Sequence, residues 1–129
     1  MGNVCHAIFN HFQTLKGDRT LQSADRILAV GMPKSYDYLR HHMPQDSEVS
    51  CVGFGALSPE FLEDLQVDCI LCPLFTHDFD CIELTERLHR HGFEGGVRAV
   101  TAYVPRADIV RKDVVRTYPG VNFDILQLP

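Results

Sequence analysis

Five short apolar runs, each separated from the next by an amphipathic stretch, constrain this chain more than any other feature. The runs are rich in β-branched residues and almost continuously apolar, as strands are when a parallel sheet is covered on both faces. A length of 129 residues with 45% hydrophobic side chains fits one domain with a real core. The alternation therefore predicts a single α/β domain, with strands at residues 26–31, 48–54, 67–75, 97–104 and 123–128.

Helix signals occupy the stretches between these runs. One helix is expected to begin after Ser58, an N-cap residue that is followed by Pro59 at the first helical position. Another is expected to begin after Asp80 and to end at Gly92. The four expected helices cover residues 34–43, 58–66, 80–92 and 106–120.

The order of these elements is βαβαβαβαβ with short connections. Right-handed crossovers then predict a doubly wound, five-stranded parallel sheet in the flavodoxin-like order 2-1-3-4-5, within a core of residues 25–129. An extra helix is expected in the N-terminal extension, residues 1–22, where Val4, Ile8 and Phe12 follow a helical spacing. No helix is expected after the last strand. The N-terminal helix is therefore expected to fill that place on the sheet, or to exchange between two chains.

Charge and hydropathy exclude several classes of function. The net charge is −5, from 17 acidic and 12 basic residues, which argues against direct nucleic-acid binding. A basic cluster between residues 106 and 116 is interspersed with aspartates, as on a solvated helix face. No stretch approaches the roughly 20 apolar residues of a membrane helix, and the N-terminus does not have the pattern of a secretory signal. We therefore expect no membrane association.

Five cysteines give an odd count, and most lie in apolar runs, where a free thiol behaves as a small hydrophobic group. A reducing cytoplasm is the expected location. Cys69 and Cys72 form a CxxC pattern, which in other settings marks a redox or zinc site. Residues three apart in a strand point to opposite faces, so we interpret both as buried structural thiols.

From about residue 25 onward, the landmarks of the chain resemble those of the receiver domains of response regulators. The run that begins at Asp68 occupies the place of the receiver's third strand, Thr101-Ala102 matches the end of the fourth strand, and Pro129 matches the end of the fifth. The individual matches are not specific motifs. Their joint register over five strands carries the resemblance.

The departures from the receiver pattern fall on one functional set. Gly31 and Met32 stand where receivers carry two acidic magnesium ligands, Pro73 stands at the phosphoacceptor aspartate, and Leu128 stands at the lysine, whereas Thr101 is retained. Magnesium needs hard oxygen ligands and an acyl phosphate needs a carboxylate, which these replacements do not supply. The resemblance therefore implies a degenerate receiver, or pseudo-receiver, that is not phosphorylated.

For such a domain, the resemblance implies a signalling or regulatory module that recognises a protein partner without phosphorylation. It implies no catalytic residue and no cofactor. The partner is expected to be another protein or a second copy of the chain, in a homodimer. In receivers, partners read the face around the fourth helix and the fifth strand, here residues 104–118 and 123–128.

The alternative is a small ligand-binding or catalytic α/β domain with its site at the carboxyl ends of the strands. Lys34, His77, Asp78 and Thr101 are its candidate residues, although they form no complete catalytic set. A metal site in the loop of residues 76–80 is not expected, because Asp80 is already explained as a helix cap. The loop of residues 53–55, which contains two glycines, could cradle a phosphate, but the ordinary geometry of a turn explains these glycines better.

Overall fold

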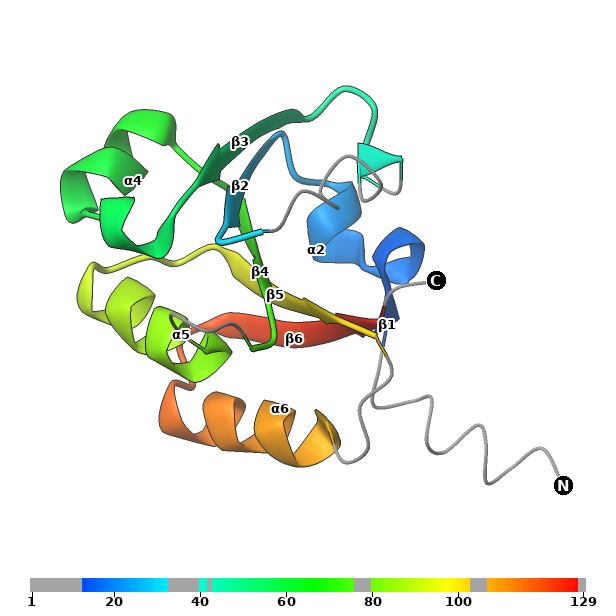
Figure 1. Cartoon of the computed structure of the whole chain (residues 1–129), viewed down its shortest axis with the longest axis vertical. Coiled ribbons are helices and arrows are strands. Elements are labelled where there is room, and N and C mark those ends of the chain that lie inside the picture. Colours follow the sequence, from blue (N-terminus) through cyan, green and yellow to red (C-terminus); the bar gives the residue numbers. More distant parts are fainter. Residues whose placement is uncertain (1–12, 33–39, 42, 76–79, 103–106, 128–129) are drawn as a thin grey trace, which may run out of the picture.

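The structure is a computed structural model that describes residues 13–32, 40–41, 43–75, 80–102 and 107–127 (Figure 1). Its centre is a parallel sheet with the strand order β1-β6-β5-β4-β2-β3. The apolar runs supply the five main strands, and in β2, β4, β5 and β6 side chains on both faces are buried, whereas those of β3 are half-buried or exposed. The strands are β1 (Gln13–Thr14), β2 (Arg26–Val30), β3 (Glu48–Val52), β4 (Cys69–Pro73), β5 (Gly96–Thr101) and β6 (Asn122–Gln127).

The five predicted strands take the predicted order. Numbered among themselves along the chain, they lie side by side as 2-1-3-4-5, and all their pairings are parallel. The two-residue strand β1 was not predicted, and it pairs with Leu126 and Gln127 at the end of β6. Within the described residues, no helix follows β6, as expected.

Three helices cover one face of the sheet: α4 (Pro59–Leu65), α5 (Cys81–Arg90) and α6 (Ala107–Thr117) (Figure 1). Their apolar side chains, among them Leu62, Leu84 and Val114, form one core cluster with the strand residues beneath them. The predicted caps of the first two are confirmed. The Ser58 hydroxyl accepts a hydrogen bond from the Phe61 amide at 3.1 Å, so α4 begins where the sequence indicated.

Both ends of α5 follow from local sequence. The Asp80 carboxylate accepts a hydrogen bond from the Glu83 amide at 2.8 Å and so caps the first turn. At the other end Gly92 has a φ of +78°, its amide bonds to His89, and the Phe93 amide bonds to the Leu88 carbonyl at 3.0 Å. This is a Schellman motif, which needs a residue in the left-handed region and therefore favours glycine.

The opposite face is covered by the N-terminal segment. A short 3₁₀ turn, η1 (Leu15–Gly17), leads into helix α2 (Arg19–Gln22) on that side of the sheet (Figure 1). Leu15 and Leu21 are fully buried there against side chains of β2, β4 and β6. The N-terminal extension thus contains a helix, α2, but at Arg19–Gln22; Val4, Ile8 and Phe12, whose spacing predicted the helix, lie outside the described residues, and residues 13–14 form a strand. Residues 1–12, and most of the predicted helix at 34–43, lie outside the described residues.

A buried polar network fixes this N-terminal segment to the sheet. Asp18 caps α2 through a 2.8 Å bond from the Leu21 amide, and its other carboxylate oxygen accepts a 2.8 Å bond from Arg98 Nε. The two side chains are 2% and 4% exposed. The Arg98 guanidinium also donates to the carbonyl and to the side chain of Asn122, at 2.6 and 3.1 Å. One ion pair therefore joins α2, β5 and β6.

Candidate functional site

The carboxyl ends of β2, β4 and β5 lie at one edge of the sheet, the edge at which open α/β sheets bind ligands. Gly31 and Met32 directly follow β2, while Pro73 and Thr101 are the last residues of β4 and β5. These two strands are neighbours, with Pro73 opposite Val100. The structure thus brings four of the sequence-predicted positions to the same edge.

The chemistry at these four positions is limited. Gly31 has a φ of +66°, and its amide donates to the Val52 carbonyl at 2.9 Å, so it serves the turn out of β2. Met32 packs against the core cluster of the N-terminal face. Only Thr101 brings a side-chain oxygen to these positions. They therefore supply neither the carboxylate pair that magnesium prefers nor a carboxylate nucleophile.

The other predicted site residues, Lys34, His77, Asp78 and Leu128, lie outside the described residues. The ligand pocket that combines the first three with Thr101 therefore stays a prediction. Among the residues that the structure does describe, no group of three or more His, Cys, Asp or Glu side chains could hold a metal ion.

The CxxC cysteines are buried on opposite faces, as predicted. Cys69 belongs to the core cluster on the N-terminal side and Cys72 to the cluster beneath the three helices. Burial raises the pKa of Cys69 to about 12, although the positive charge of Arg98 acts against this shift. Burial also raises the pKa of Cys72 well above its ordinary value, and that of Cys81 to about 12. Thiols of this kind are protonated and unreactive at neutral pH.

The glycine-containing loop after β3 is a short 3₁₀ turn, η2 (Phe54–Ala56). Gly53 and Gly55 are exposed, and no side chain caps the turn. Phe54 is fixed by Arg87, whose guanidinium lies 4.0 Å from the ring centroid and donates to the Phe54 carbonyl at 3.3 Å. The loop is thus held by packing, in agreement with the turn geometry expected for it.

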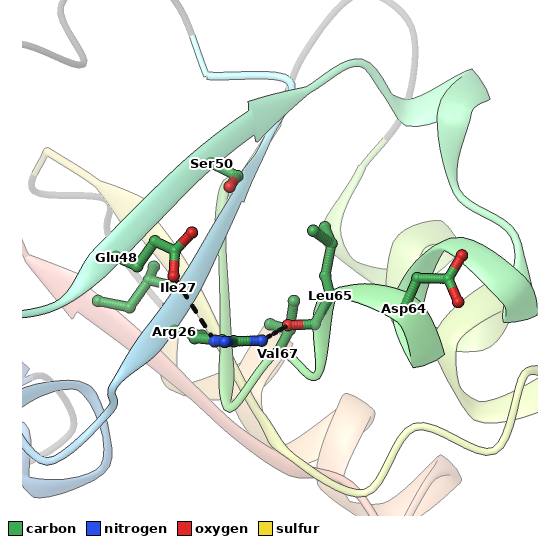
Figure 2. A pocket seen from close by; sticks show the side chains of 7 residues that line it. All are labelled: Arg26, Ile27, Glu48, Ser50, Asp64, Leu65 and Val67. Atoms are coloured by element: carbon green, nitrogen blue, oxygen red, sulfur yellow. Dashed lines mark hydrogen bonds and ion pairs between the residues drawn. The ribbon is translucent and has the colours of Figure 1, made fainter.

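A small cavity of about 80 Å³ lies between β2, β3 and the end of α4, and Figure 2 shows the side chains that line it. Arg26 crosses it, with Nη1 donating to the Leu65 carbonyl at 3.0 Å and Nε lying 3.6 Å from the Glu48 carboxylate. Ligand sites usually enclose about 300–1,000 Å³. The cavity is too small for such a ligand, and its arginine is already paired.

A larger cleft of about 420 Å³ lies between α4 and the loop from α5 to β5. It is lined by the carboxylates Glu63 and Glu94 together with His91 and Phe93. The Nε2 atom of His91 is buried and has no hydrogen-bond partner among the described residues. The neighbouring His89 packs against the ring of Tyr118, with the centroids 5.4 Å apart.

Helix α6 exposes apolar surface on the side away from the sheet. Ile109 is 46% exposed and Val115 is 37% exposed. Two basic residues of the helix are occupied by carboxylates: Arg111 lies 3.1 Å from Asp124, and Arg116 lies 2.6 Å from an aspartate one turn earlier. The helix is therefore a mixed apolar and ion-paired surface, as the interspersed charges predicted.

The strand order defines the chain as a parallel α/β protein with flavodoxin-like topology. No protein-family model matches the chain, and no curated protein matches it in sequence. None of the helices in the described part of the chain has the length and apolarity needed to span a bilayer.

Proposed function

We propose that this chain is a receiver-like regulatory module that recognises proteins without being phosphorylated. The observation that carries the proposal is the composition of the ligand-binding edge: Gly31, Met32 and Pro73 stand there without a carboxylate among them. A receiver needs acidic side chains at these places to hold magnesium and to accept a phosphoryl group. A domain that keeps the topology without that chemistry is best suited to binding.

The surface that we assign to recognition is α6 together with β6. Ile109 and Val115 give this helix exposed apolar area, and such residues bind best when flanked by polar groups. The ion pair between Arg111 and Asp124 joins the helix to β6, whose residues 123–126 are buried, so α6 supplies the exposed part of this surface. The proposed setting is the cytoplasm, in keeping with the four free cysteines of the described residues.

The first test is whether a phosphoryl mimic binds. Beryllium fluoride with Mg²⁺ is titrated into ¹⁵N-labelled protein, and the amide spectrum is followed. We expect no saturable shift at Thr101 or at the residues after β2 and β4. A saturable shift at these residues would show that the edge still binds phosphoryl groups and would refute the proposal.

The second test concerns the recognition surface. Wild-type protein, an Ile109→Glu variant and a Gln45→Glu control are compared in quantitative affinity capture from an extract of the source cells. Gln45 is exposed and lies far along the chain from α6, so the control adds the same charge elsewhere. We expect proteins that are captured by the wild type and the control but lost with Ile109→Glu. Identical capture by all three would refute the assignment to α6.

A further inference from the structure

The outer edge of β3 is an open strand edge. In its parallel ladder with β2, the Glu48 amide donates to the Asp25 carbonyl at 2.7 Å, and the Val52 carbonyl accepts from the Gly31 amide at 2.9 Å. Alternate residues of a strand direct their backbone groups to opposite sides. Residues 48, 50 and 52 thus bond to β2, whereas Val49 and Cys51 direct their N–H and C=O groups outward.

The residues that flank this edge are already engaged within the chain. The Ser47 carbonyl accepts a hydrogen bond from Arg40 Nη2 at 3.1 Å, and the Ser47 amide donates to the Pro44 carbonyl at 3.3 Å. At the other end, the Gly53 carbonyl accepts from the Ala56 amide at 3.1 Å. Within the described part of the chain, the open groups are the N–H and C=O groups of Val49 and Cys51, placed symmetrically about residue 50, and beyond them the Gly53 N–H.

The edge also lacks the features that usually prevent strand pairing, such as lysine, proline or a bulge. Its one charged residue, Glu48, is at the first position and turns toward Arg26 (Figure 2). The opposite edge of the sheet is protected, because β1 pairs with part of β6 and the Asp124 carboxylate lies on β6. Among the described residues, β3 is thus the edge that lacks such protection.

We infer that β3 pairs antiparallel with β3 of a second copy of this chain, about a two-fold axis at Ser50. Val49 then faces the partner's Cys51, and Cys51 faces the partner's Val49, so that the N–H and C=O groups of both residues form four hydrogen bonds. A register shifted by two residues would oppose Val49 to Gly53, or Cys51 to Ser47, whose carbonyls are already engaged. The open groups of Val49 and Cys51 are their own complement, which is why we assign the edge to a second copy.

The charges agree with the antiparallel arrangement. It places Glu48 opposite the partner's Val52 rather than opposite another carboxylate, whereas parallel pairing would place the glutamates side by side. Asp46 and Glu48, both exposed, approach the end of the partner's β3, where Arg87 lies over Phe54. The antiparallel orientation therefore keeps the acidic ends of the two strands apart, which favours it over the parallel one.

The inference does not depend on the function proposed above, because the recognition surface on α6 lies at the other end of the sheet from β3. A variant at Ile109 therefore tests the proposed function without affecting the β3 edge, and a variant at Cys51 tests the dimer without affecting α6. A four-bond edge contact is small, so the dimer is expected to dissociate in the micromolar to millimolar range.

Sedimentation velocity of the full chain at about 10 μM to 1 mM tests the oligomeric state. We expect a concentration-dependent shift toward the mass of two 14.6-kDa chains. Cys51→Pro removes the outward N–H from each copy, two of the four bonds, and should weaken the dimer roughly thirtyfold. Cys51→Lys places a charge on the edge without changing the backbone, so it should also weaken the dimer and replaces the proline variant if that variant does not fold. Cys51→Ser is the matched control and should keep the dimer.

Disulfide trapping tests the register. In a Cys5→Ser and Cys51→Ser background, Ser50→Cys places two thiols across the axis as a non-hydrogen-bonded pair, in which side chains approach closely. We expect mild oxidation to cross-link Ser50→Cys faster than the native Cys51 in a Cys5→Ser chain. A monomer at every concentration, a dimer unaffected by the proline and lysine variants, faster cross-linking at Cys51, or pairing only with an added foreign peptide would each overturn the inference.

Discussion

The buried ion pair between Asp18 and Arg98 makes a sharp prediction about stability. Asp18→Asn keeps an oxygen that can cap α2 but removes the negative charge and turns an N–H donor toward the guanidinium. The two side chains are 2% and 4% exposed, so the arginine would remain as a buried and uncompensated charge. Breaking a buried pair in this way costs about 3–5 kcal/mol, a large part of the 5–15 kcal/mol that stabilises most domains.

The capping bond can be separated from the charge by a second substitution. Asp18→Ala removes both the ion pair and the 2.8 Å bond to the Leu21 amide, so it should cost about 1 kcal/mol more than Asp18→Asn. In the double variant that combines Asp18→Ala with Arg98→Met, no buried charge is left unpaired. The loss should then be about 2 kcal/mol smaller than the sum of the single losses, within the range of coupling for residues in contact.

Urea unfolding followed by far-ultraviolet circular dichroism measures these free energies, since the chain has no tryptophan. Glu86→Gln is the control, because the pair of Glu86 with Arg90 spans 3.7 Å with both side chains at least half exposed. Such a surface pair contributes below about 1 kcal/mol. If Asp18→Asn lies within about 1 kcal/mol of the wild type, the argument from the buried charge is refuted.

Three further predictions concern single positions. Gly92→Ala should destabilise the protein by about 1–2 kcal/mol, because the φ of +78° is costly for alanine although the added Cβ meets nothing within 4 Å. Gly120→Ala, where a Cβ also meets nothing within 4 Å, is the control and should change the unfolding free energy by less than about 0.5 kcal/mol. Equal melting curves for the two variants would contradict this. In a Cys5→Ser background, a thiol reagent at pH 8 should label Cys51 rapidly and the buried thiols only on unfolding, and mass spectrometry that finds a buried thiol labelled first would disprove the burial argument. Burial raises the pKa of Cys81 to about 12, so this thiol stabilises the fold below the unfolded pKa near 9 and loses that contribution as pH rises. The difference in unfolding free energy between wild type and Cys81→Ala, measured in urea, should therefore shrink by about 1 kcal/mol from pH 9 to 10. An unchanged difference would contradict the assignment.

The helix boundaries were predictable because they depend on neighbouring residues. Ser58 and Asp80 each bond to an amide three residues later, and Gly92 ends its own helix, so a short stretch of sequence contains the whole interaction. The strand order followed from crossover handedness once the runs were placed. Neither inference required knowledge of distant contacts.

The missed features depend on contacts between distant residues. The strand at Gln13–Thr14 consists of two residues that pair with β6 more than 100 positions later, and no local pattern marks it. Arg98 lies within an apolar run, and a lone arginine among buried neighbours indicates a buried partner, but the run does not show which residue that partner is. Asp68, matched to a receiver landmark, accepts hydrogen bonds at 3.0 Å from the amides of Asp25 and Arg26, which gives it a structural role.

The candidate site was predictable only in part for a related reason. Thr101 and Pro73 were placed at the correct edge because strand ends follow from strand runs. What the edge binds depends on side chains of the loops beyond it, including Lys34, His77 and Asp78, and loops have no periodicity from which their geometry follows. The site prediction therefore stops where the regular structure ends.

The polar network around Arg98 also sets an order of events during synthesis. Asp18 is separated from Arg98 by 80 positions, and Thr20 lies within 3.4 Å of Asn122, 102 positions later. At about 5–20 residues per second, translation leaves the N-terminal segment without these partners for roughly 5–20 s. Leu15 and Leu21 are synthesised before β2, β4 and β6, the strands on which they pack. Docking of this segment is therefore complete only after β6 has been made, and a nascent chain halted before β6 would lack its contacts with Asn122 and Leu126.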